Sequence, residues 1–112
     1  MNITDRDIKM WASIGARATF GIAALELAKK NKDLIIVTSD VSTSAGLDRY
    51  RKTLPEQYVD VGIAEQNMIG IASGLASENF KVITTTFSPF QVLRCCEQIK
   101  MNLGYMQNKV CM

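Results

Sequence analysis

Two carboxylates and two aromatic rings follow three short apolar runs of the sequence, and their types suit the binding of a flat ring. The residues are Asp40, Glu65, Phe87 and Phe90. A carboxylate can hydrogen-bond a ring nitrogen, and phenyl rings can stack on a heteroaromatic ligand. Each residue also has a structural explanation: Asp40 caps a turn, Glu65 complements a helix N-terminus, and the phenylalanines belong to the core. Spacing alone leaves both interpretations open.

Composition excludes several other kinds of site. The chain has no histidine, which excludes a Ser-His-Asp triad or a His-ligated metal site within it. Glycine-rich loops of the G-x-G-x-x-G and G-x-x-x-x-G-K-S/T types are absent, so classical dinucleotide and P-loop sites are not supported. Three cysteines, two of them adjacent, cannot form a disulfide framework. We therefore expect reduced thiols and a cytoplasmic protein.

The elements that must position these residues alternate between strand and helix patterns. Runs rich in β-branched residues predict strands at residues 34–38, 58–61 and 80–87. Helical spacing predicts helices at about residues 10–30, 64–78 and 88–103, with a shorter helical turn at 47–54. This alternation predicts an α/β domain over residues 1–112, a doubly wound, mostly parallel sheet with helices on both faces. In such sheets ligands bind beyond the carboxyl ends of the strands, so the four candidate residues would share one rim.

Capping residues and glycine set the expected ends of the helices. Thr4 or Asp5 is a suitable N-cap near the start of the chain. Ser88 and Pro89 suit the N-cap and the first position of the last helix, and Gly104 suits its end.

Residues 109–112 are typical of a fourth strand that has just begun. A finished domain seldom ends where an inner strand starts. We therefore expect a single, partial domain, either cut short or completed by another chain. The alternative is a frayed tail.

Charge and hydropathy are those of an ordinary globular domain. The 112 residues are 47% apolar and 21% charged, with a net charge of +2. This charge is too small to indicate nucleic acid or a membrane as a partner. No apolar run approaches the ~20 residues of a membrane span. Residues 1–7 lack the apolar stretch of a signal peptide.

Small residues form one face of the helix expected after Glu65. Gly70 and Gly74 lie four positions apart, with Ser73 beside them. A helical glycine costs about 1 kcal/mol relative to alanine, which is tolerated where another backbone comes close. The neighbour is either this chain's own sheet or a second subunit, and the sequence favours neither.

Four separated motifs, in order, resemble the transketolase family of thiamine-diphosphate enzymes. The central motif is DVGIAEQNMIGIASGLA at residues 60–76, which is also similar to that of 1-deoxy-D-xylulose-5-phosphate synthases. The others are Arg17, residues 39–44 and residues 86–90. The resemblance runs over nearly the whole chain and covers the first part of the family's pyrimidine-binding domain.

The resemblance implies thiamine diphosphate as the cofactor. Glu65 would be the catalytic residue that hydrogen-bonds the far ring nitrogen of the aminopyrimidine. This contact shifts the ring's amino group toward its imino tautomer, so that it can take a proton. Phe87 and Phe90 would pack around the ring and exclude water, which strengthens the Glu65 contact.

The resemblance also implies roles for residues outside the pyrimidine contact. Asp40 would bind the cofactor near its thiazolium side. Arg17 and Ser44 would hold the phosphate of a sugar substrate. Two positions depart from the family's pattern: Asn67 replaces the histidine of many synthases, and Leu93 replaces an aromatic residue of many transketolases.

The function implied is that of the pyrimidine-binding portion or subunit of a transketolase-like enzyme, which transfers a two-carbon ketol unit between phosphosugars. The Gly-Asp-Gly motif that binds the diphosphate and its metal in this family is absent. We therefore expect a diphosphate-binding partner chain to bring Mg or Ca, this chain alone to be inactive, and a homo-oligomer, a dimer or larger. The alternatives are a non-catalytic fragment that only self-associates, a piece of a 1-deoxy-D-xylulose-5-phosphate synthase-like carboligase, and an unrelated flavodoxin-like nucleotide binder.

Overall fold

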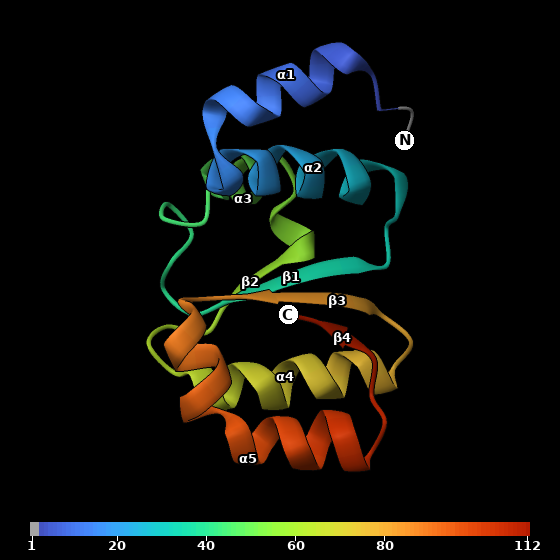
Figure 1. Ribbon diagram of the computed structural model, residues 1–112. Helices are drawn as coiled ribbons and strands as arrows, with labels where there is room; N and C mark the ends of the chain where they lie inside the picture. The colour runs from blue at the N-terminus through green and yellow to red at the C-terminus, as the bar shows by residue number, and fades with distance from the viewer. Residues whose placement is uncertain (1–2) are drawn as a thin grey trace.

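The computed structural model describes residues 3–112, and helices and strands alternate along the chain (Figure 1). The strands are β1 (Leu34–Thr38), β2 (Tyr58–Asp60), β3 (Lys81–Thr85) and β4 (Val110–Cys111). The α-helices before β3 are α1 (Asp5–Ile14), α2 (Ala16–Lys30), α3 (Asp48–Thr53) and α4 (Glu65–Ser77), with a 3-10 turn, η1 (Pro55–Gln57), before β2. Between β3 and β4 lie two π-helical segments, η2 (Phe90–Arg94) and η3 (Ile99–Tyr105), on either side of the short α5 (Cys96–Gln98).

The four strands form one parallel sheet in the order β2-β1-β3-β4. The predicted fold class, a doubly wound parallel sheet with helices on both faces, is therefore confirmed. Thr38 at the end of β1 is in register with Asp60 of β2 and Thr85 of β3. The carboxyl ends of β1, β2 and β3 consequently lie at one edge of the sheet. Residues 110–111 pair with β3, so the predicted fourth strand is present in place of a frayed tail.

Helices cover both faces of the sheet (Figure 1). An apolar core lies on each face, and β1 contributes alternate residues to the two cores. Leu34 and Ile36 pack with α2 and α3, whereas Ile35 and Val37 pack with α4 and the segment around Cys95. All five residues of β1 are buried, as expected for the central strand of a parallel sheet covered on both faces.

The predicted helix over residues 10–30 is wrong, because Gly15 divides it. Gly15 has φ 82° and ψ 166°, a conformation that ends α1 before α2 begins. Thr4 is the N-cap of α1, as predicted, and forms a capping box with Asp7. Helical spacing continues across the break, which is why the periodicity of the sequence does not reveal it.

The predicted ends of the last helix are also wrong. The carbonyl of Phe87 accepts hydrogen bonds from the N–H groups of Phe90 and Gln91, so Ser88 lies inside the first turn and does not cap it. At the other end, Gly104 lies within η3, which continues to Tyr105. π-Helical hydrogen bonding widens the turn, and the helical spacing of the sequence does not distinguish it from an α-helix.

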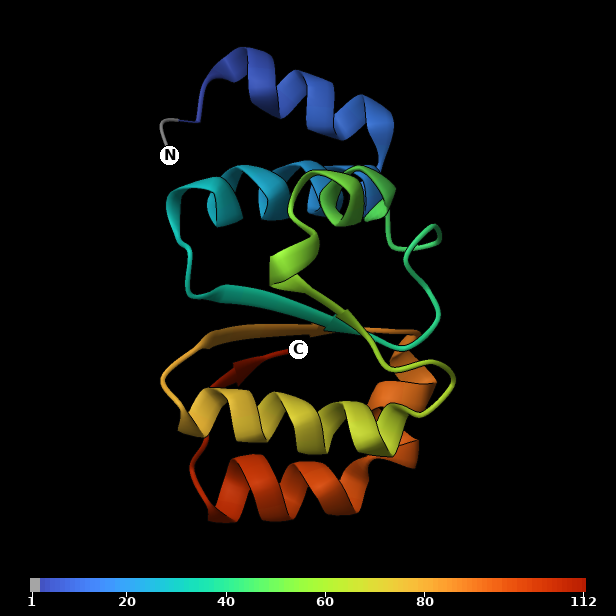
Figure 2. The same ribbon diagram turned by 180° about the vertical axis from the view of Figure 1, so that it is seen from behind.

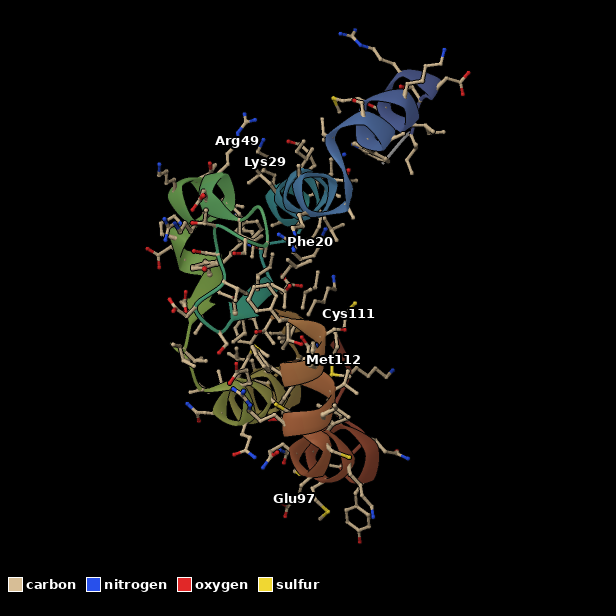
Figure 3. All side chains as sticks on the ribbon, turned by 60° about the vertical axis from the view of Figure 1, so that its left-hand side comes forward. Phe20, Lys29, Arg49, Glu97, Cys111 and Met112 are labelled. Atoms are coloured by element: carbon tan, nitrogen blue, oxygen red, sulfur yellow. The ribbon has the colours of Figure 1, made fainter. Side chains whose placement is uncertain are left out.

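Helix α1 extends away from the body of the molecule and packs mainly against α2 (Figure 3). None of its residues is buried, and Ile8, Met10 and Ile14 expose 40% or more of their surface. Within residues 3–112, no helix is long and apolar enough to cross a membrane.

Candidate functional site

The topological switch point of the sheet lies between β1 and β3, and a cavity of about 230 Å³ opens there. The connection after β1 leaves toward one face of the sheet, whereas the connection after β3 leaves toward the other (Figure 1). Ligands of open α/β sheets bind in the crevice that this arrangement creates. The lining residues are Ala16, Arg17, Phe20, Val41, Ser44, Ala45, Thr85, Thr86 and Phe87.

The loops after β1 and β2 and the start of η2 gather at this end of the sheet, on the right in Figure 2. Ser39 joins two of them, because its hydroxyl donates to the carbonyl of Gly62 at 2.6 Å and accepts from the N–H of Ala64 at 3.1 Å. Gly62 has φ 71°, a left-handed conformation that favours glycine. This turn delivers Glu65 to the first position of α4.

Glu65 is buried, and its only described ionic partner is Arg94. Arg94 Nη1 donates to Oε2 of Glu65 at 2.7 Å, and the side chains are 45% and 5% exposed for Arg94 and Glu65, respectively. No side chain caps α4, so the first N–H groups of the helix favour a negative charge at this position. The sequence therefore places a desolvated carboxylate at the rim, with a cation beside it.

The two predicted aromatic residues form one unit with this ion pair. The rings of Phe87 and Phe90 lie edge to face, with centroids 6.1 Å apart. The guanidinium carbon of Arg94 lies 4.2 Å from the centroid of Phe90. Glu65, Phe87 and Phe90 are thus brought together, and Arg94 is the residue that joins them.

Asp40 lies at the same end of the sheet but outside this cluster. It is exposed, with φ 53°, and its N–H donates to Oδ1 of Asp60 at 2.9 Å. Asp60 also accepts from the N–H of Gly62 at 3.0 Å. The turn explanation therefore accounts for the backbone of Asp40, while its carboxylate lines neither the cavity nor the Glu65 cluster.

Arg17 and Ser44, the predicted phosphate ligands, both line the cavity. They meet there because α2 and the loop after β1 approach closely. A Cβ on Gly21 would overlap the carbonyl of Gly46, and a Cβ on Gly46 would press against the backbone of Arg17. Figure 3 places Phe20, another lining residue, on the side of α2 that faces the sheet.

One buried polar atom beside this cavity has no partner within the described residues. Thr86 Oγ1 is buried and makes no hydrogen bond. An unpaired buried hydroxyl costs about 1–3 kcal/mol, so a ligand in the cavity that bonded it would recover that free energy.

Cys95 packs beside the ion pair and is chemically quiet. Burial raises the pKa of its thiol, and the negative charge of Glu65 raises it further, while Arg94 opposes the rise. The thiol donates to the carbonyl of Phe90 at 3.3 Å. Cys95 is therefore a packing residue and no nucleophile at neutral pH.

The small-residue face of α4 does not pack against this chain. A Cβ on Gly70 or Gly74 would meet nothing within 4 Å. Ser73, in contrast, turns inward: its hydroxyl accepts from Asn108 Nδ2 at 2.7 Å and donates to the carbonyl of Asn102 at 3.4 Å. Of the two explanations for the glycines, packing against the chain's own sheet is therefore wrong.

The parallel sheet and its rim residues define an α/β domain with a candidate ligand site at the carboxyl ends of the strands. A family model described as "Transketolase, pyrimidine binding domain" matches residues 12–112. The chain belongs to this family. Membership implies dependence on thiamine diphosphate, and it excludes the unrelated flavodoxin-like alternative, which the strand order alone would have allowed.

Several known proteins are similar to this chain. A subunit of apulose-4-phosphate transketolase from Phocaeicola vulgatus is 43% identical over 97 residues, which are 87% of this chain and 31% of that protein. "Putative transketolase C-terminal section" of Methanocaldococcus jannaschii is 37% identical over 91 residues, 81% of this chain and 29% of that protein. "1-deoxy-D-xylulose-5-phosphate synthase" of Microcystis aeruginosa is 40% identical over 80 residues, 71% of this chain and 12% of that protein.

A solved structure has the same fold. It is named "Split gene transketolase, inactive beta4 tetramer" and superposes with a TM-score of 0.75 and 32% sequence identity, over 84% of this chain and 31% of that chain. The present chain thus spans at most 31% of each of these relatives.

The residues at the rim fit the aminopyrimidine end of thiamine diphosphate. A buried carboxylate beside two aromatic rings offers an acceptor for a ring N–H and an apolar face for the ring. Residues 3–112 contain no group of three or more Cys, Asp or Glu side chains able to hold a metal ion. The chain therefore offers a ring site within its described part and no built metal centre there.

Sequence reasoning missed Arg94 and Thr86. Arg94 comes four residues after Phe90, so the sequence places them one turn apart, but its partner Glu65 is 29 positions away. Thr86 is part of a quoted motif, yet only the three-dimensional structure shows that its hydroxyl is buried without a partner.

Proposed function

We propose that the chain forms the pyrimidine-binding half of the thiamine-diphosphate site of a transketolase-like enzyme, with Glu65 as its catalytic residue. One observation carries the proposal: a buried carboxylate at the start of α4 lies beside the Phe87–Phe90 pair, in a chain of this family. When bound, thiamine diphosphate supplies the nucleophilic carbon and, on its pyrimidine, the base. Glu65 holds a proton at the far ring nitrogen, and the phenylalanines keep water from that contact.

A diphosphate-binding partner chain completes this site and brings the metal, Mg or Ca. The names of relatives support this arrangement, since one is named as a subunit of a transketolase and another as a "C-terminal section". The exposed apolar side chains near the rim support it too. Ile63 is 77% exposed, Phe87 43%, Phe90 37% and Leu93 76%. Large apolar side chains exposed to this degree at one end of the sheet are typical of a surface that another chain covers.

The proposed reaction is the transfer of a two-carbon ketol unit between phosphosugars. Arg17 and Ser44 support a phosphate-bearing substrate, because they line one cavity together with Phe87 and with the unpaired Thr86 hydroxyl. An arginine guanidinium and a hydroxyl are suitable donors to phosphate oxygens. Asp40 remains a proposed contact on the thiazolium side.

A second candidate is a carboligase like 1-deoxy-D-xylulose-5-phosphate synthase, which is favoured by the 40% identity to the Microcystis aeruginosa protein. Self-association without catalysis is a third, favoured by the name of the similar structure, an inactive β4 tetramer. Both would use the same fold. The substrate specificity of the assembled enzyme separates the carboligase from the first candidate, and the absence of any turnover would identify the third.

The test replaces Glu65 by Gln in the chain co-purified with the diphosphate-binding chain of the same organism. Gln keeps the shape of the side chain but cannot hold the proton, so ketol transfer should fall by roughly 10²-fold or more. Glu97→Gln is the matched control, because Glu97 is exposed on the outer side of α5 (Figure 3). Turnover of Glu65→Gln equal to that of the control would rule the assignment out.

A further inference from the structure

The buried carboxylate of Glu65 already has a ligand from within the chain. Arg94 Nη1 lies 2.7 Å from Oε2, and the guanidinium carbon lies 4.2 Å from the centre of the Phe90 ring. Arg94 is 45% exposed, whereas Glu65 is 5% exposed. The guanidinium thus reaches an inner carboxylate from the solvent side and covers one face of Phe90.

A guanidinium makes the same two interactions that an aminopyrimidine requires. It is flat, it donates N–H groups in its own plane, and it stacks on aromatic faces. A ring that hydrogen-bonds Oε2 and stacks on this face of Phe90 would need the volume that the Arg94 side chain fills. A carboxylate oxygen can accept two hydrogen bonds, but one face of a phenyl ring cannot hold two flat groups at once.

We propose, on the basis of the proposed function, that Arg94 is an internal competitor of the cofactor's pyrimidine and so sets the affinity of the ring site. The ring binds when the guanidinium leaves Oε2 of Glu65 and the face of Phe90. The backbone of Arg94 stays in place, because Gln66 Nε2 donates to its carbonyl at 3.0 Å. Only the flexible, half-exposed side chain has to move.

Because of this competition, the affinity of a ligand depends on the contacts that it makes outside the ring site. A lone pyrimidine ring must displace Arg94 with its own contacts, so it binds weakly. A ligand whose diphosphate is also bound by a partner chain gains additional binding free energy, which offsets the cost of displacing Arg94. Arg94 thereby keeps the carboxylate paired until the complete ligand arrives.

The experiment titrates the chain with 4-amino-5-hydroxymethyl-2-methylpyrimidine, a neutral ring without diphosphate, and follows the Phe87 and Phe90 ring signals by NMR. Arg94→Ala should lower the dissociation constant by about three- to thirtyfold, the size expected for a half-exposed ion pair plus a cation–π contact. Arg94→Lys should lie between Ala and wild type, because an ammonium pairs with Glu65 but does not stack flat. Arg49→Ala, exposed on α3, is the charge-matched control and should leave the constant unchanged.

The Glu65→Gln background supplies the second arm. Without the carboxylate, Arg94 keeps only its contact with the face of Phe90, so Arg94→Ala should then raise the affinity by no more than about two- to fivefold. A supporting result is a gain on Arg94→Ala that is clearly smaller in this background than in the wild-type background. If the wild-type chain binds the ring through Glu65 and Arg94→Ala binds it equally or more weakly, the competitor role is wrong and the proposed function stands. If no variant shows ring binding that depends on Glu65, both are wrong.

Discussion

Three residues, Gly62, Ser39 and Arg94, determine the surroundings of Glu65. Gly62 turns the chain, Ser39 fixes the turn to the end of β1, and Arg94 pairs with the carboxylate. Removing a partner from a buried charge is costly, since the charge is left without compensation. The carboxylate is therefore paired with Arg94 in the free chain, and a ligand would have to replace Arg94 as its partner.

The position of Glu65, Phe87 and Phe90 at one rim was predictable from sequence, because each lies at or just after the carboxyl end of a predicted strand of a parallel sheet. The partner of Glu65 was not, since side-chain pairing across 29 positions depends on how η2 packs against α4. For Asp40, the place after β1 was predictable from sequence. Its positive φ and the hydrogen bond from its N–H to Oδ1 of Asp60 arise only in the folded turn.

Tyr50 makes stability depend on pH in the alkaline range. Burial raises the pKa of Tyr50 from its ordinary value of 10 to about 12. The neutral phenol is favoured in the folded state, so the stability it contributes is fully present below pH 10 and is lost as pH rises from 10 through 12. Urea titrations across this range should show the free energy of unfolding falling as pH rises.

Tyr50→Phe should reduce this slope, because one titrating group contributes at most about 1.4 kcal/mol per pH unit. Some slope should remain, since burial also raises the pKa of Tyr58. Tyr50 donates only a long, 3.4 Å hydrogen bond to the carbonyl of Gln57, so the variant should fold at pH 7. An identical slope in both proteins would show that Tyr50 titrates equally in the folded and unfolded states.

At the scale of elements, the close approach of α2 to the loop after β1 is what brings Arg17 and Ser44 to one cavity. Gly21 and Gly46 permit it, because neither has a side chain at the contact. Helical spacing predicted one helix over residues 10–30, of which residues 16–30 form α2. It could not reveal that Gly15 breaks the longer helix, because a single backbone conformation, φ 82° and ψ 166°, interrupts it without changing the spacing of apolar residues.

Gly21→Ala should lower the free energy of unfolding by about 1–3 kcal/mol, the usual cost of overpacking, because the new methyl group meets the backbone of Gly46 and cannot displace a flexible side chain. Gly70→Ala is the same change in the middle of another helix, with nothing within 4 Å of the new atom. It should raise stability by about 0.5–1 kcal/mol through helix propensity alone. Urea unfolding of the two variants measures both effects, and a Gly21→Ala protein as stable as Gly70→Ala would contradict the close contact.

On the scale of the whole molecule, the two faces of the sheet are covered, but two other surfaces are open. One is the exposed stripe of α4 with Gly70 and Gly74. The other is a broad hollow of about 1100 Å³ along β3 and β4, whose exposed apolar lining includes Leu27, Phe80 and Met112. Uncovered apolar surface and a sheet edge of this kind favour association with another chain.

Gly74→Leu should weaken assembly of the chain while leaving its fold intact. In the free chain the leucine would point into open space, and it would improve helix propensity at the exposed position. Only a second chain crossing closely over Gly70 and Gly74 would meet the larger side chain. An overpacked contact costs about 1–3 kcal/mol, which corresponds to a dissociation constant higher by roughly five- to 150-fold.

Sedimentation velocity at micromolar concentration measures this effect. Lys52→Leu is the control, because it adds the same exposed side chain to α3, on the opposite layer of the molecule (Figure 1). Assembly of the wild type and the control, together with a monomeric, well-folded Gly74→Leu protein, is the expected result. A wild-type chain that remains monomeric at this concentration, or a Gly74→Leu chain that assembles like the control, would show that this face of α4 forms no homo-oligomer contact. The two glycines would then serve a different partner, or no contact at all.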